Sequence, residues 1–185
     1  MNTIFAAILA LWLFLWAWLS TNKAVYQTGT SSSGGLTSLA SSSTFLAGYE
    51  WFVVDNTTEL ALDYQIQGNI TVGTTPTANT EIRLYVVASF DGSTWPDVFD
   101  GTASAETVTN AGVMSGFMVL AKVIQVTATT SNVAMPFSFT VASLFGGTVP
   151  KKFVVYVAHN TGVNLNATAG NHTYLYTPYD TTNSA

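Results

Sequence analysis

The feature that most constrains this fold is a two-residue alternation of apolar and polar side chains, which recurs in four segments between residues 60 and 176. Residues 60–67 read LALDYQIQ, and the same spacing recurs at 82–90, 153–157 and 172–176. Successive side chains of a β-strand point to opposite faces, so this period is typical of half-buried strands.

Three further apolar stretches, at 49–54, 117–127 and 137–143, are also expected as strands. Turn-forming dipeptides such as Asp91-Gly92 and Gly146-Gly147 separate the strand candidates. After residue 20 no long stretch has the period of an amphipathic helix. Seven or eight strands at this spacing predict an all-β domain, an antiparallel β-sandwich with jelly-roll arrangement.

The phase of the alternation also predicts which side chains face the core. The residues expected to point inward are Leu62, Tyr64, Ile66, Leu84, Val86, Phe139, Val155 and Val157.

An uninterrupted apolar run from Ile4 to Leu19 precedes this domain. It contains no charge, Pro or Gly, so a hydrophobic N-terminal helix is expected, which at about 1.5 Å per residue spans about 24 Å. Because it is apolar on every face, it must be buried all round. Three interpretations stay open: a cleaved signal peptide, a lipid-contacting anchor, and a plug buried against protein.

Residues 21–44 are rich in Ser, Gly and Thr, a composition typical of a flexible spacer or a strand edge. The chain is therefore divided into a hydrophobic helix at 1–20, a linker at 21–44 and a β-sandwich domain at 45–185.

The composition excludes several classes of function. The net charge of −5 argues against nucleic acid binding, which needs clustered Lys and Arg. The absence of cysteine excludes disulfides and thiolate metal sites.

No constellation of catalytic residues stands out, and no catalytic, cofactor-binding or metal-binding residue is assigned. His159 and His172 are expected as surface or loop histidines. The loop from Asp91 to Asp100 holds three aspartates that suit calcium, but Asp91 and Asp100 precede glycine and are expected to cap turns. Trp95 in this loop suits either sugar stacking or loop packing.

Four stretches together resemble small virion structural proteins encoded by tailed bacteriophages. They are 69–76, 93–102, 141–147 and 150–172, and the likeness spans Ser38 to Tyr176. The resemblance implies a structural role and supplies no catalytic residue. The apolar run at 4–19 is a departure from the family's pattern.

The expected function is therefore that of a non-enzymatic structural protein of a bacteriophage particle, of capsid decoration or minor capsid type and located in the virion. Its expected partners are copies of itself and other virion proteins, with lipid or protein contacts through residues 4–19 and no cofactor. The alternatives are a membrane-anchored or secreted glycan-binding adhesion module and a secreted or anchored hydrolase.

Overall fold

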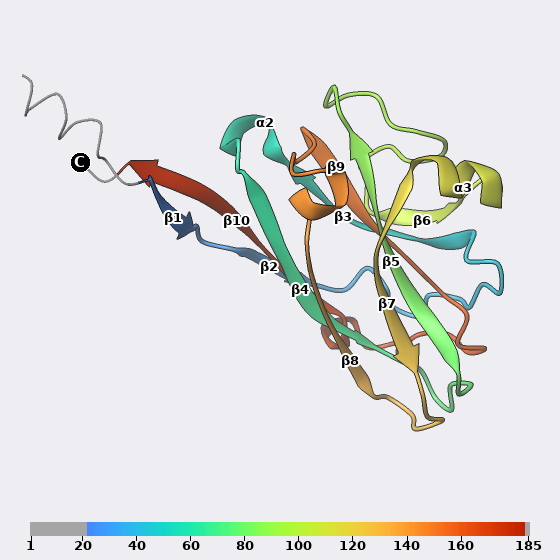
Figure 1. The fold of residues 1–185 in the computed structure, drawn as a ribbon. Coiled ribbons are helices and arrows are strands. Elements are labelled where there is room, and N and C mark those ends of the chain that lie inside the picture. Colours follow the sequence, from blue (N-terminus) through green and yellow to red (C-terminus); the bar gives the residue numbers. More distant parts are fainter. Residues whose placement is uncertain (1–21, 184–185) are drawn as a thin grey trace, which may run out of the picture.

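The computed structural model describes residues 22–183, and these residues form a mostly β fold (Figure 1). The strands are β1 (Asn22–Tyr26), β2 (Thr30–Ser33), β3 (Ala47–Asp55), β4 (Asp63–Thr71), β5 (Thr80–Ser89), β6 (Ser104–Thr107), β7 (Met118–Val126), β8 (Ala134–Thr140), β9 (Lys152–His159) and β10 (Thr173–Asn183). Short helices α2 (Asn56–Glu59), α3 (Ala111–Phe117), η1 (Ala142–Phe145) and η2 (Ala169–Asn171) connect them.

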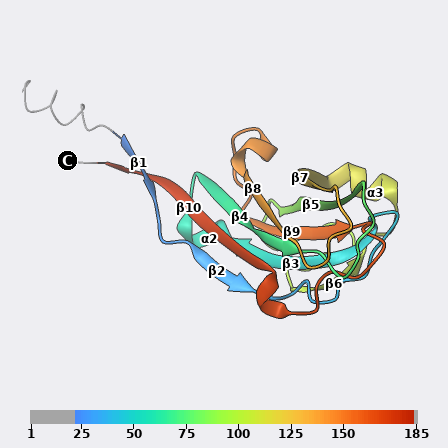
Figure 2. The same cartoon turned by 90° about the horizontal axis from the view of Figure 1, so that it is seen from below.

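The strands form two sheets in which every pairing is antiparallel. One sheet has the order β1-β10-β4-β8, with β2 also paired to β10, and the other has the order β6-β3-β9-β5-β7. The β1–β10 pair runs out from the body of the molecule, at the end opposite α3 (Figure 2). The predicted all-β antiparallel architecture is confirmed.

The main core lies between the two sheets. Tyr64 and Ile66 of β4 pack with Leu84 and Val86 of β5, and all four side chains are fully buried. Aromatic contacts join the layers as well, since the Phe52 and Tyr174 rings stack with centroids 3.9 Å apart. Burial of this apolar surface is the main stabilising contribution, at roughly 25 cal/mol per Å².

Seven of the eight predicted core positions pack in or against this core. Tyr64, Ile66, Leu84, Val86, Val155 and Val157 are fully buried, and Phe139 is partly buried against the core. Leu62 is the exception: its prediction is wrong, because β4 begins at Asp63 and the Leu62 side chain is 50% exposed.

A second core lies on the other face of the β3-β9-β5 sheet. Tyr85 and Val87 of β5 pack here with Tyr156 of β9, so this sheet is apolar on both faces. Phe45 and Phe99, which lie in connecting segments, complete the second core.

Residues 22–44 belong to the sandwich rather than to a separate linker. β1 and β2 both pair with β10. Leu36 is fully buried in the main core, and the Trp51 indole N–H donates to the Gly34 carbonyl oxygen at 2.7 Å. The predicted linker and its boundary at residue 45 are therefore corrected here.

The hydrophobic helix predicted at residues 4–19 lies outside the described residues. Within residues 22–183, no helix has the length and hydrophobicity needed to cross a membrane.

Candidate functional site

The most distinctive surface feature is built by the connection between β5 and β7. This connection, residues 90–117, is called the insertion below; it contains a long loop, β6 and α3. It supplies Phe99, Val108 and Met114 to the second core and so covers the outer face of the sheet.

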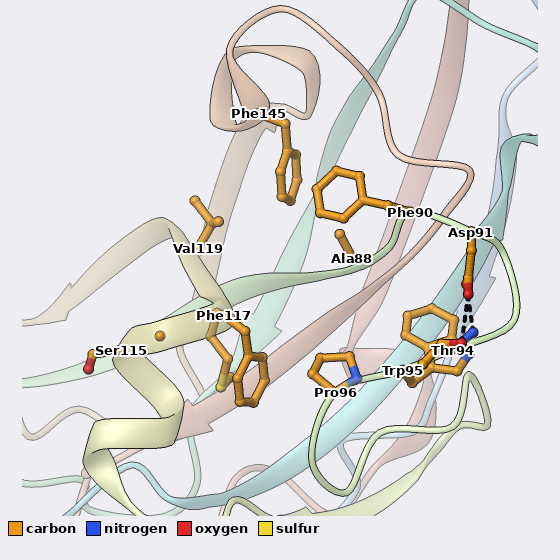
Figure 3. Close-up of a pocket in the computed structure, with 12 residues that line it drawn as sticks. Ala88, Phe90, Asp91, Thr94, Trp95, Pro96, Ser115, Phe117, Val119 and Phe145 are labelled. Atoms are coloured by element: carbon orange, nitrogen blue, oxygen red, sulfur yellow. Dashed lines mark hydrogen bonds between the residues drawn. The ribbon is translucent and has the colours of Figure 1, made fainter.

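The insertion forms one side of an open pocket of about 700 Å³ (Figure 3). Most of its wall is apolar: Phe90, Trp95, Pro96, Phe117, Val119 and Phe145. Phe90 is 66% exposed, and its ring meets the Phe145 ring edge-to-face at 5.9 Å. An exposed phenylalanine beside a concave apolar wall is suited to contact with a partner surface or a ligand.

Asp91 and Asp100 cap turns of the insertion, as the sequence predicts, whereas Asp97 accepts hydrogen bonds from the backbone N–H and hydroxyl of Thr109. The Asp91 carboxylate accepts hydrogen bonds from the backbone N–H groups of Ser93 at 2.9 Å and Thr94 at 2.7 Å, and from the Thr94 hydroxyl. These hydrogen bonds hold the pKa of Asp91 well below its usual range. Asp100 caps Thr102 in the same way, at 2.7 Å.

The calcium interpretation gains no support from this arrangement. In the part of the chain that the structure describes, no three His, Asp or Glu side chains come together as a metal site.

Trp95 packs on its own loop and lines the pocket at the same time. Its ring lies over Gly101, where a Cβ atom would come within 3.1 Å of the indole. Gly101 also has a φ of +83°, a conformation that L side chains rarely adopt. The loop-packing interpretation of Trp95 therefore holds, and one edge of the residue remains available to the pocket.

The two histidines are fully buried, so the prediction of a surface position is wrong; His159 is the last residue of β9, whereas His172 lies in the connection between η2 and β10. His159 Nε2 donates to the Leu39 carbonyl oxygen at 3.0 Å, and His172 Nε2 lies 2.8 Å from the Asn166 carbonyl oxygen. Each histidine thus anchors a connecting segment to the sandwich. Burial lowers the pKa of both side chains.

Glu50 is the unusual residue that the sequence analysis missed. It lies in β3 and is 1% exposed, and neither carboxylate oxygen has a hydrogen-bond partner. Burial, together with the nearby carboxylates of Asp100 and Glu106, raises the pKa of Glu50 to about 7, although the backbone N–H groups of Asp100 and Gly101 act in the opposite direction. The available signal was a glutamate inside the otherwise apolar stretch YEWFVV at 49–54.

Few of the side chains that line the pocket can ionise. Asp91 is the one titratable side chain that lines it, and the turn occupies that carboxylate. Comparisons with protein-family models, with curated proteins and with solved structures give no match, so no relative supplies a role for any residue of this pocket.

Proposed function

We propose that this chain is a non-enzymatic structural protein of a bacteriophage particle, of capsid decoration or minor capsid type, and that its sandwich is a jelly roll. The observation that carries this proposal is the nested pairing of its strands. Jelly rolls are double sheets of eight strands, and capsid domains are among their characteristic occurrences.

The nesting becomes clear when β1 and β6 are set aside. The first remaining strand pairs with the last, the second with the second-last, and so inward: β2 with β10, β3 with β9, β4 with β8, and β5 with β7. The β10–β4 and β9–β5 pairings then join these pairs into two four-stranded sheets. An antiparallel ribbon rolled up on itself gives this order.

The polar but weakly charged surface supports the same role. Charged residues make up 8% of the chain, and the described residues contain two ion pairs, Arg83–Glu81 and Lys152–Asp55. Burying an unpaired charge in an interface is costly, whereas Ser, Thr and Asn can be buried with one or two hydrogen bonds. Such a surface suits broad contacts between neighbouring subunits.

Quantitative mass spectrometry of purified particles of the virus that encodes the chain tests the proposal. A structural subunit is expected at tens to hundreds of copies per particle, as repeated subunit contacts require. Its absence from purified particles, with abundance in the host cell, would contradict the proposal.

The pocket favours a second candidate, a glycan-binding adhesion module, because jelly rolls also occur in lectins and Trp95 offers an aromatic edge. Purified protein applied to a glycan array should then bind saturably, and Trp95→Ala should abolish that binding. Tyr26→Ala is the matched control, since Tyr26 is an exposed aromatic residue that does not line the pocket. Absence of saturable binding would exclude this candidate.

A further inference from the structure

We propose that Glu50 is a proton-controlled latch: its neutral form holds the insertion against the sheet, and its ionised form loosens the insertion. The response depends on the fold of this chain alone and not on the proposed role in a particle.

The position of Glu50 places its side chain beneath the insertion. In β3 it pairs with Ser104 of β6 on one side and with Tyr156 of β9 on the other. Two residues earlier, a Cβ atom at Gly48 would meet the Tyr156 ring, which belongs to the second core. Side chains two apart in a strand share a face, so Glu50 also points to the face that the insertion covers.

A β-bulge explains how an acid comes to be buried there. The register between β3 and β9 shifts between Glu50 and Phe52, and Trp51 and Phe52 both pack into the main core. The bulge places one extra residue in β3, so the strict alternation fails and Glu50 takes the opposite face.

Burial and the acidic side chains around Glu50 oppose its ionisation, and the backbone N–H groups of Asp100 and Gly101 offset this effect only in part. Asp100 of the loop and Glu106 of β6 are both acidic. Tyr156 of β9 does not supply a proton, because its hydroxyl donates to the Leu46 carbonyl oxygen at 2.7 Å. Among residues 25–181, whose side chains the structure describes, no basic side chain forms an ion pair or hydrogen bond with Glu50. An ionised Glu50 therefore gains from moving toward water.

The segment that we expect to loosen when Glu50 ionises is the turn around Asp100 and Gly101. Next to it, Phe99 packs edge-to-face on Tyr156 at 5.4 Å, and Gly101 supports the ring of Trp95. Loosening this turn disturbs the second core and one wall of the pocket together. The shape of the pocket is thereby coupled to pH.

Hydrogen exchange of the full chain, read on peptides covering residues 99–108 and corrected for intrinsic exchange rates, tests the latch. If the pKa of Glu50 falls from about 7 when covered to its ordinary 4.5 when released, linkage predicts about 30-fold faster exchange at about pH 8 than at about pH 5.5. Peptides from β4 should show no such change.

Glu50→Gln should remove this pH dependence and keep residues 99–108 protected at both pH values. Glu59→Gln, which changes an exposed glutamate outside the insertion, is the matched control and should retain the wild-type response. Equal protection of the wild-type protein at the two pH values, or an unchanged response in Glu50→Gln, would overturn the proposal.

A second variant keeps the test valid if Glu50→Gln folds poorly. Asp100→Asn removes one neighbouring charge while an asparagine can still cap Thr102. The midpoint of the exchange response should move to lower pH. A midpoint that stays in place would show that Glu50 does not control the turn.

Discussion

Three buried titratable side chains affect the pH dependence of stability in this weakly charged protein. The two histidines, His159 and His172, act in one direction, and Glu50 acts in the other. The histidines have lowered pKa values, so the unfolded chain binds more protons than the folded one below about pH 6.5. Glu50 has a raised pKa, so between about 4.5 and 7 the folded chain binds more protons.

Stability should therefore rise with pH through the histidines and fall with pH through Glu50. The stabilisation from the neutral histidines is present above about pH 6.5 and is lost as the pH falls below it. Urea unfolding of Glu50→Gln should show a steeper loss of stability between about pH 7 and pH 5 than wild type. If the free energy of unfolding depends on pH in the same way in wild type and in Glu50→Gln, Glu50 does not oppose the effect of the histidines.

Val155 offers a second test at the scale of one residue. It is fully buried between the sheets, so Val155→Asp places an unpaired carboxylate in the core and should cost several kcal/mol, enough to unfold the domain. Val53→Asp is the control, because Val53 is 40% exposed on β3; it should cost less than about 1 kcal/mol. If the Val155→Asp variant has the melting temperature of the wild-type protein, the Val155 side chain does not lie in the core.

At the scale of the elements, the alternation of side chains located β4, β5 and β9 because each has one face on the main core. It could not show that the outer face of the β3-β9-β5 sheet is also covered, since that cover comes from the insertion, which lies outside these strands. The bulge at Glu50 breaks the two-residue period, so the position of Glu50 was not readable from spacing.

The predicted linker was wrong for a different physical reason. β2 reads TSSS and all four side chains are exposed, so the backbone pairing with β10 holds this strand. Composition indicates the properties of the side chains, but it does not show whether the backbone N–H and C=O groups pair with another strand.

The pocket could be predicted only in part from the sequence. Trp95 stood out in the sequence, whereas Phe145 reaches the pocket from η1, about fifty residues away along the chain.

The turn that holds Trp95 gives a prediction for the insertion. Gly101→Val requires a β-branched residue at a φ of +83° and crowds the indole, so it should destabilise the protein by about 1–3 kcal/mol. Gly116→Ala in α3 is the matched control: nothing lies within 4 Å of its Cβ position, and alanine favours helix, so stability should hold or rise by up to about 1 kcal/mol. Equal melting temperatures for the two variants would contradict the packing described.

At the scale of the whole molecule, the apolar run at 4–19 and the sandwich have separate tasks in the proposed particle. Sixteen consecutive apolar residues need burial that a water-exposed chain does not provide, at roughly 1.5–3 kcal/mol for each large side chain. A protein beginning at Thr21 should therefore fold and stay soluble yet fail to enter particles, as measured by immunoblotting of purified particles. Normal incorporation would show that the segment is dispensable.

We propose above that this sandwich is a repeated subunit of a virus particle. The most direct measurement is an electron cryo-microscopy reconstruction of the purified particles. Density for the two sheets, with the β1–β10 pair extending from each copy, should repeat with the symmetry of the particle. A reconstruction at side-chain resolution in which every protein density belongs to other chains would contradict the claim.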